Sequence, residues 1–147
     1  MIREATGADI PAMHTIRMAV KENRLNNPAL VTLRDYEEYI ERRGKGWVLE
    51  HDDHIRAFAI IDIINKNVWA LFVEPAHEKK GYGNQLQQVM LDWYFKRSGK
   101  PVWLSTAPGT RAERFYRNTG WAETGLTLNG EIRFEMTKKQ WEKTFSE

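Results

Sequence analysis

The sequence predicts an α/β fold, more specifically an α+β mixed sheet, in which helices flank a central and mostly antiparallel sheet. Three observations lead to this fold class. Apolar residues recur at helical spacing near the N-terminus. Runs of β-branched and aromatic residues joined by polar turns then fill residues 47–73, which is typical of an antiparallel meander. The rest of the chain alternates helix-like and strand-like segments and ends in a hairpin pattern, so one mixed sheet accommodates the whole order.

The N-terminal segments predict a short strand followed by two helices. Residues 2–5 are strand-like, and Asp9 is the expected N-cap of the first helix. Residues 26–28 (Asn-Asn-Pro) end that helix. Residues 32–35 (Thr-Leu-Arg-Asp) resemble a capping box that opens a second helix, which Gly44 closes.

The central segments predict three strands and a long helix. Polar turns separate strand-like runs at residues 47–50, 55–64 and 68–73. From Tyr82 to about Arg97 the apolar period becomes helical, with one buried stripe.

The C-terminal segments predict a strand, two short helices and a hairpin. A strand over residues 102–106 precedes a short helix over residues 110–118, which ends at Gly120. Residues 129–130 (Asn-Gly) lie between two strand-like runs and predict a type I′ turn. Residues 138–145 predict a final helix.

Size and composition bound the function. A chain of 147 residues suits one domain over residues 1–147. With 22 Lys and Arg against 20 Asp and Glu, the net charge of +2 does not favour nucleic-acid binding. The sequence has no cysteine, and His51 and His54 lack a third ligand at suitable spacing, so no metal site is expected. Without a run of roughly 20 apolar residues or a signal-peptide core, we expect a cytoplasmic protein that does not bind membranes. A homodimer is compatible with the sequence.

Residues 75–86 (PAHEKKGYGNQL) predict an anion site at the start of the long helix. The N–H groups and the dipole at a helix N-terminus favour anions. Gly81 and Gly83 permit close backbone approach, and Lys79 and Lys80 add positive charge. The pattern matches neither a P-loop nor a dinucleotide fingerprint. The alternative is an ordinary glycine-containing turn with solvated lysines.

A second segment places three side chains on one face of the following short helix. Ala112, Phe115 and Tyr116 lie at positions i, i+3 and i+4. A phenol with an ordinary pKa of about 10 can serve as a general acid toward a departing thiolate. The alternative is a core aromatic residue whose hydroxyl lies at the edge of the core.

Together, the two segments resemble the GCN5-related N-acetyltransferase (GNAT) family. That family shows Val-x-Pro, then Arg/Gln-x-x-Gly-x-Gly/Ala opening a long helix, and later Ala-x-x-Phe-Tyr with Gly-Phe/Trp. The corresponding residues here are 73–75 (Val-Glu-Pro), 78–83 (Glu-Lys-Lys-Gly-Tyr-Gly) and 112–121. This sequence departs from the pattern at Glu78 and the following Lys79, where the family has Arg or Gln and then glycine. Gly109 also replaces a frequent asparagine.

The resemblance implies acetyl-CoA as cosubstrate, in a twisted sheet whose strands splay at the acetyl-CoA site. The diphosphate is expected on the backbone of residues 79–84 and the pantetheine arm along residues 71–73. A backbone amide near Phe72 or Val73 is expected to polarise the thioester carbonyl, and Tyr116 matches the general acid. The cofactor-binding residues implied are Leu71, Phe72, Val73, Lys79, Lys80, Gly81, Tyr82, Gly83, Asn84, Gly109, Phe115 and Tyr116. Glu78 is expected to point to solvent with its charge offset by the two lysines, and His77 to face solvent.

A base that neutralises the acceptor amine is less clearly indicated. The candidates are Glu22, late in the first helix, Asp62, on a strand face shared with apolar residues, and Glu74. For each, a solvated or salt-bridged structural acid is the alternative, and water alone can suffice for an amine of modest pKa.

These patterns predict an acetyl-CoA-dependent N-acetyltransferase that acts by direct attack of a primary amine on the thioester. The acceptor is a small molecule or a peptide. The alternatives are a non-catalytic acyl-CoA sensor, or an acyltransferase that uses another donor or a hydroxyl acceptor.

Overall fold

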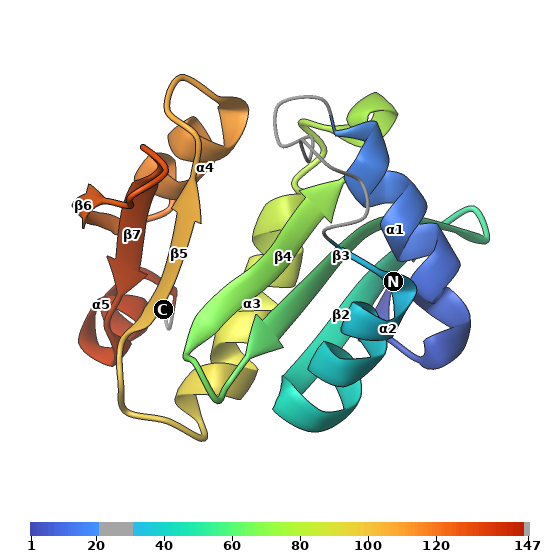
Figure 1. Cartoon of the computed structure of the whole chain (residues 1–147), viewed down its shortest axis with the longest axis horizontal. Coiled ribbons are helices and arrows are strands. Elements are labelled where there is room, and N and C mark those ends of the chain that lie inside the picture. The colour runs from blue at the N-terminus through green and yellow to red at the C-terminus, as the bar shows by residue number, and fades with distance from the viewer. Residues whose placement is uncertain (21–30, 146–147) are drawn as a thin grey trace.

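The computed structural model describes residues 1–20 and 31–145. Seven strands form one sheet in the order β1-β2-β3-β4-β5-β7-β6, and every neighbouring pair is antiparallel except β4 and β5. Helices flank this sheet (Figure 1), so the predicted mixed and mostly antiparallel architecture is confirmed. The elements are β1 (Ile2–Glu4), η1 (Gly7–Asp9), α1 (Ile10–Ala19), α2 (Leu33–Glu38), η4 (Tyr39–Arg43), β2 (Gly44–His51), β3 (His54–Asp62), β4 (Asn67–Val73), η5 (Pro75–His77), α3 (Tyr82–Phe95), β5 (Val102–Thr106), α4 (Arg111–Asn118), β6 (Ala122–Leu126), β7 (Ile132–Met136) and α5 (Lys138–Phe145).

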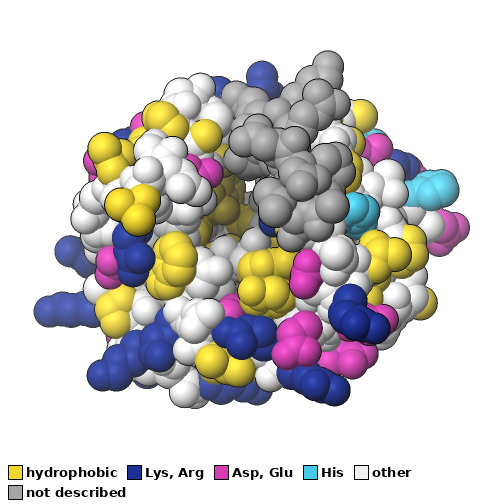
Figure 2. Space-filling view, viewed as in Figure 1, with side chains coloured by type: hydrophobic (Ala, Val, Ile, Leu, Met, Phe, Trp, Pro, Cys, Tyr) yellow, Lys and Arg dark blue, Asp and Glu magenta, His cyan; other side chains and the backbone are white. Residues whose placement is uncertain are grey.

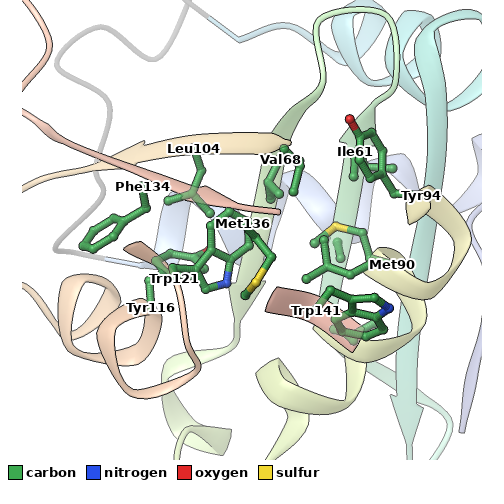
Figure 3. Close-up of a cluster of buried hydrophobic side chains, with 14 of the residues drawn as sticks. Ile61, Val68, Met90, Tyr94, Leu104, Tyr116, Trp121, Phe134, Met136 and Trp141 are labelled. Carbon is green, nitrogen blue, oxygen red and sulfur yellow. The ribbon is translucent and has the colours of Figure 1, made fainter. Parts of the chain in front are cut away.

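Two apolar cores lie on opposite faces of the sheet. Helices α1 and α2 cover one face of β2–β4, where Met13, Tyr36 and Phe58 are fully buried. Helix α3 covers the other face (Figure 1), and its buried stripe packs into a larger core that extends to β5, β7 and α5. Figure 3 shows this larger core, in which Met90 of α3 lies near Trp141 of α5. Side chains at i and i+4 share a helix face, so the apolar spacing in the sequence produces this burial.

Strands β4 and β5 touch at one end and then diverge. The only residue pair in their ladder is Asn67 with Trp103. The Trp103 N–H donates to the Lys66 carbonyl at 2.9 Å, and the Asn67 side-chain amide donates to the Trp103 carbonyl at 3.2 Å. Beyond this point the last residues of β4 pair with β3 and, within the part of the chain that the structure describes, with no other strand. The predicted splay of the strands is therefore confirmed.

The start of the second helix is capped as predicted. The Thr32 N–H donates to Asp35 Oδ2 at 2.7 Å, and the Asp35 N–H donates to Thr32 Oγ1 at 3.2 Å. This reciprocal pair satisfies two N–H groups that would otherwise lack partners at the helix start. The helical segment then ends in a π turn before Gly44, which begins β2.

Asp9 holds the N-cap position of α1, as predicted, but its side chain does not cap the helix. The 3-10 turn η1 runs directly into α1, so Asp9 has helical backbone angles and its side chain makes no cap hydrogen bond to α1. Its carboxylate instead accepts hydrogen bonds from the Thr6 N–H and from the Arg3 guanidinium, each at 2.8 Å. The hydrogen bonds from Arg3 lower the pKa of this carboxyl. Asp9 thus ties β1 to the first helical turn.

The C-terminal hairpin is confirmed, but its predicted turn type is wrong. A type I′ turn requires positive φ at both central residues, and only Gly130 of the Asn129-Gly130 pair has one, with φ of 82°. The Gly130 N–H donates to the Thr127 carbonyl at 3.0 Å, and the Thr127 N–H donates to the Glu131 carbonyl at 2.8 Å. This pattern is a three-residue loop that ends in a left-handed glycine.

Candidate active site

A pocket lies where β4 and β5 diverge, between the β4 edge, the loop of residues 74–81, the start of α3 and helix α4. The surface is hollowed here, and Figure 2 shows hydrophobic side chains in the depth of the hollow. A ligand of elongated shape could therefore enter the sheet along the edge of β4. The lining residues are Val20, Leu71, Phe72, Val73, His77, Glu78, Lys79, Gly81, Tyr82, Gly83, Asn84, Arg111, Ala112, Phe115 and Tyr116.

The loop of residues 74–81 delivers the N-terminus of α3 to this pocket. Gly81 caps the helix in a left-handed conformation with φ of 81°. The first N–H groups of a helix have no partner within the helix, and those of Tyr82, Gly83 and Asn84 belong to residues that line the pocket. A Cβ at Gly83 would meet the Phe115 ring at 3.5 Å and Val73 at 3.7 Å. A bare backbone at Gly83 therefore leaves more space between α3, β4 and α4.

The open edge of β4 exposes main-chain groups to the pocket. The Glu74 N–H donates to the Arg56 carbonyl at 2.8 Å, which fixes the side of the strand that faces β3. Main-chain groups of successive strand residues point to alternate sides. Phe72 therefore bonds toward β3, whereas the N–H and C=O groups of Leu71 and Val73 point toward the gap. No main-chain partner for these groups occurs among the described residues, so Leu71 and Val73 offer donors and acceptors to an extended ligand.

Tyr116 projects from α4 between the pocket and the larger core. Tyr116 is 7% exposed. Its ring packs edge-on against Phe115 and Trp121 at centroid distances of 5.1 and 5.5 Å. Figure 3 shows Tyr116 and Trp121 side by side. Burial raises the pKa of the Tyr116 phenol above its ordinary value. The hydroxyl therefore stays protonated at neutral pH and can donate a hydrogen bond.

Glu78 and His77 do not lie where the sequence suggested. Glu78 lines the pocket, and its Oε2 is 3.4 Å from Nε of Arg111, so its counter-ion is Arg111 on α4 and not a neighbouring lysine. His77 also lines the pocket, its side chain is 18% exposed, and its Nδ1 lies 3.7 Å from Glu74 Oε1. The expectations that both side chains face solvent are therefore wrong.

Most of the predicted cofactor residues lie around the pocket, and two do not. Lys80 is exposed outside the lining. Gly109 also lies outside it, and its N–H donates to Glu113 Oε1 at 2.7 Å in the turn before α4. Arg111 was missed by the sequence reasoning, although it precedes Phe115 by four residues and so shares its helix face. Val20 was also missed. Apolar spacing near the end of α1 indicates that a side chain is buried, but it does not show which strand or pocket that side chain faces.

The structure does not bring Asp62 to the pocket. Asp62 pairs with Asn67 at the opposite end of β4, about 20 Å along the strand from Val73. Its carboxylate is 1% exposed, and it accepts hydrogen bonds from the Arg43 guanidinium and from the N–H groups of Ile64 and Asn65. Asp62 therefore holds the β3–β4 turn.

The remaining base candidates have no demonstrated place at the reacting centre. Glu22 lies outside the described residues. Glu74 lies next to the pocket, but its carboxylate pairs with Arg56 at 3.3 Å. Within residues 1–20 and 31–145, no group of three or more potential metal ligands occurs. No helix in the same part of the chain is long and apolar enough to span a membrane.

Comparison with known proteins assigns the family. A model of the acetyltransferase (GNAT) family matches residues 10–121, which is most of the chain. The chain belongs to the GNAT family. The resemblance seen in the two sequence segments and the prediction of an acetyltransferase are thereby confirmed. A search of curated protein sequences returned no match.

Solved N-acetyltransferase structures share the fold at low sequence identity. The ribosomal-protein-S18-alanine N-acetyltransferase from Escherichia coli is 20% identical with a TM-score of 0.72, and the alignment covers 92% of this chain and 90% of that one. A ribosomal-protein-alanine N-acetyltransferase from Brucella melitensis is 21% identical with a TM-score of 0.75, with 93% and 99% covered. The PaiA N-acetyltransferase from Thermoplasma acidophilum, solved in complex with coenzyme A, is 13% identical with a TM-score of 0.80, with 93% and 98% covered.

Proposed function

We propose that this GNAT protein transfers the acetyl group of acetyl-CoA to a primary amine of a small molecule or peptide by direct attack. The observation that carries the proposal is the pairing of two features across one pocket. The open main-chain groups of Leu71 and Val73 lie on one wall, and the buried phenol of Tyr116 lies on another. A single domain over residues 1–147 and a cytoplasmic location belong to the same proposal.

The residues around the pocket suit each part of coenzyme A. The N–H groups at the start of α3 and the side chain of Lys79 suit the diphosphate. The open edge at Leu71 and Val73 suits the pantetheine arm, whose two amide groups can pair with a strand edge. The apolar side chains of Phe115 and Ala112 cover the arm from the α4 side.

The proposed reaction uses main-chain and side-chain groups of residues that line the pocket. Bound acetyl-CoA supplies the acetyl group as a thioester. A main-chain N–H of Val73 or Leu71 donates a hydrogen bond to the thioester oxygen as negative charge develops there. The nitrogen–carbon bond forms, the carbon–sulfur bond breaks, and the Tyr116 hydroxyl donates toward the departing sulfur. The amine proton passes to water or to Glu22, one of the three candidate bases in the sequence, and Tyr116 regains its proton from solvent. The products are an N-acetylated amine and the CoA thiol.

Release of free CoA from acetyl-CoA, measured against a panel of amines, tests the proposal. The panel contains amino acids, small alkyl amines, polyamines and peptides with an N-terminal alanine. The peptides are included because two neighbouring structures are named as ribosomal-protein-alanine N-acetyltransferases. We expect CoA release that depends on one class of acceptor, with the N-acetyl product identified by mass. Tight binding of acetyl-CoA without turnover of any acceptor would instead support a non-catalytic acyl-CoA sensor.

A further inference from the structure

We propose that Arg111 is a ligand-binding residue of this pocket, whose guanidinium contacts the diphosphate of bound acetyl-CoA. This inference rests on the proposed function. It assigns to α4 a binding role that is separate from the proton donation by Tyr116.

The first support is the position of the pair. Arg111 Nε lies 3.4 Å from Glu78 Oε2, and both residues line the pocket. They come from different walls, because Glu78 belongs to the loop of residues 74–81 and Arg111 is the first residue of α4. The side chains are 31% and 36% exposed, respectively, so the guanidinium is accessible at the pocket mouth.

The second support is the charge balance of the loop. A carboxylate at Glu78 repels an anion held on the N–H groups that follow it in the chain. Lys79 alone only cancels that charge. Arg111 makes the formal charge of these three lining residues positive, which is what a doubly charged diphosphate requires.

The third support is the chemistry of the guanidinium group. Arginine presents five N–H donors in a planar fork, which match phosphate as well as carboxylate oxygens. Ion pairs as exposed as that of Arg111 and Glu78 contribute little to stability. With five donors, the guanidinium can hold Glu78 and a phosphate at the same time.

Titration calorimetry with three ligands tests this assignment. Coenzyme A carries all phosphates, dephospho-CoA lacks the 3′-phosphate, and pantetheine carries none. We expect Arg111→Gln to weaken binding of both CoA and dephospho-CoA by about 10- to 100-fold, as for loss of a charge-assisted hydrogen bond. Pantetheine binding should stay within about twofold. Arg111→Lys should recover part of the affinity because it restores the charge but not the fork.

Two further variants serve as controls. Arg114→Gln removes the same charge from an exposed position of the same helix that does not line the pocket, and its CoA affinity should stay within about twofold. Glu78→Gln should leave CoA affinity unchanged or improve it by about two- to fivefold, because a repulsive charge is removed.

Four outcomes would overturn the inference. Arg111→Gln could bind CoA as tightly as Arg114→Gln does, which would remove Arg111 from the site. It could weaken pantetheine as much as CoA, which would indicate a packing role for α4. It could affect CoA but not dephospho-CoA, which would assign the contact to the 3′-phosphate. A loss on Glu78→Gln larger than that on Arg111→Gln would mean that Glu78 itself contacts the ligand. If the unmodified protein bound no CoA, the proposed function itself would fail.

Discussion

The Tyr116 side chain lies between the larger core and the pocket. One side of its ring packs against Trp121 and Phe134 of the larger core, and the residue also lines the pocket. The sequence left open whether it is a core aromatic or an acid, and the structure places it where both descriptions apply. Because burial raises the pKa of its phenol, the hydroxyl is a donor over the whole neutral pH range.

Replacement of Tyr116 by Phe tests the acid role. We expect kcat to fall by about 10- to 10⁴-fold, the range for loss of a general acid, with acetyl-CoA affinity little changed. The ring and its packing remain, so folding should be preserved, which circular dichroism checks. An unaltered kcat would remove Tyr116 from the mechanism.

The pH profile gives a second readout of the same residue. An ordinary phenol ionises near pH 10, and the raised pKa of Tyr116 keeps it protonated to higher pH. The kcat of the unmodified enzyme should therefore show no decline between about pH 8 and pH 10. If kcat fell in that range for the unmodified enzyme but not for Tyr116→Phe, the fall would reflect ionisation of the Tyr116 phenol. That result would contradict a raised pKa for Tyr116.

Lys79 has a backbone conformation that favours glycine. Its φ is 67°, and a side chain in the left-handed region costs about 1–2 kcal/mol. We therefore expect Lys79→Gly to raise the free energy of unfolding by about 0.5–1 kcal/mol, because the relief outweighs the extra freedom of glycine in the unfolded chain. Urea denaturation without ligand measures it.

The matched control is the next residue. Lys80 does not have a positive φ, so Lys80→Gly should lower the free energy of unfolding by about 0.5–1 kcal/mol. Equal effects of the two substitutions would show that the backbone at Lys79 is not strained.

At the scale of elements, the turn between β3 and β4 depends on Asp62. Its buried carboxylate accepts hydrogen bonds from Arg43 at 3.0 and 3.1 Å and from the Ile64 and Asn65 N–H groups at 3.0 and 3.1 Å. We expect Asp62→Ala to lower the free energy of unfolding by about 2–4 kcal/mol, with kcat unchanged in the folded fraction. Denaturant titration and steady-state kinetics together measure this.

An exposed ion pair provides the comparison. Asp92 pairs with Lys96 at 2.9 Å on the surface of α3, so Asp92→Ala should change the free energy of unfolding by about 0.5 kcal/mol or less. A selective loss of kcat in Asp62→Ala, without destabilisation, would restore Asp62 as a base candidate.

The elements were predictable where the signal is local. The capping box at Thr32 and the strand at Val102–Thr106 depend on neighbouring residues, and both appear as expected. The turn at Asn129-Gly130 was misassigned because loop length, and not the residue pair alone, determines the turn type. The capping hydrogen bond expected of Asp9 does not form because its carboxylate bonds to Arg3 of β1 and to the Thr6 N–H.

The candidate site was predictable in its chain order but not in its pairings. The 78–83 and 112–116 segments lie on two walls of one pocket, as their order suggested. The Glu78–Arg111 pair depends on the distance between α4 and the loop of residues 74–81. The spacing of residues in the sequence does not predict that distance. The distance of Asp62 from the pocket likewise depends on strand direction and register, which place Asp62 opposite Asn67 at the far end of β4.

At the scale of the whole molecule, the two halves of the sheet are joined by packing more than by the ladder. Strands β4 and β5 share one residue pair. The larger core nevertheless spans both halves, and the Trp121 Nε1–H donates to Gln87 Oε1 at 2.7 Å within it. The gap between the strands can therefore stay open as a binding site while the halves remain attached.

This packing predicts one cooperative unfolding transition. Far-UV circular dichroism and tryptophan fluorescence should give coincident denaturation curves, because the six tryptophans are spread over both halves. CoA at about 100 times its Kd should shift both curves together, equivalent to about 2.7 kcal/mol. Two separated transitions would contradict a single domain over residues 1–147.

A crystal structure of the protein with acetyl-CoA is the most direct test of the central claim, that the gap between β4 and β5 is the acetyl-CoA site. The account predicts main-chain hydrogen bonds from the pantetheine arm to Leu71 and Val73, the diphosphate against the first N–H groups of α3, and the Tyr116 hydroxyl in contact with the sulfur. A ligand bound outside the gap, or a Tyr116 hydroxyl turned away from the sulfur, would contradict it.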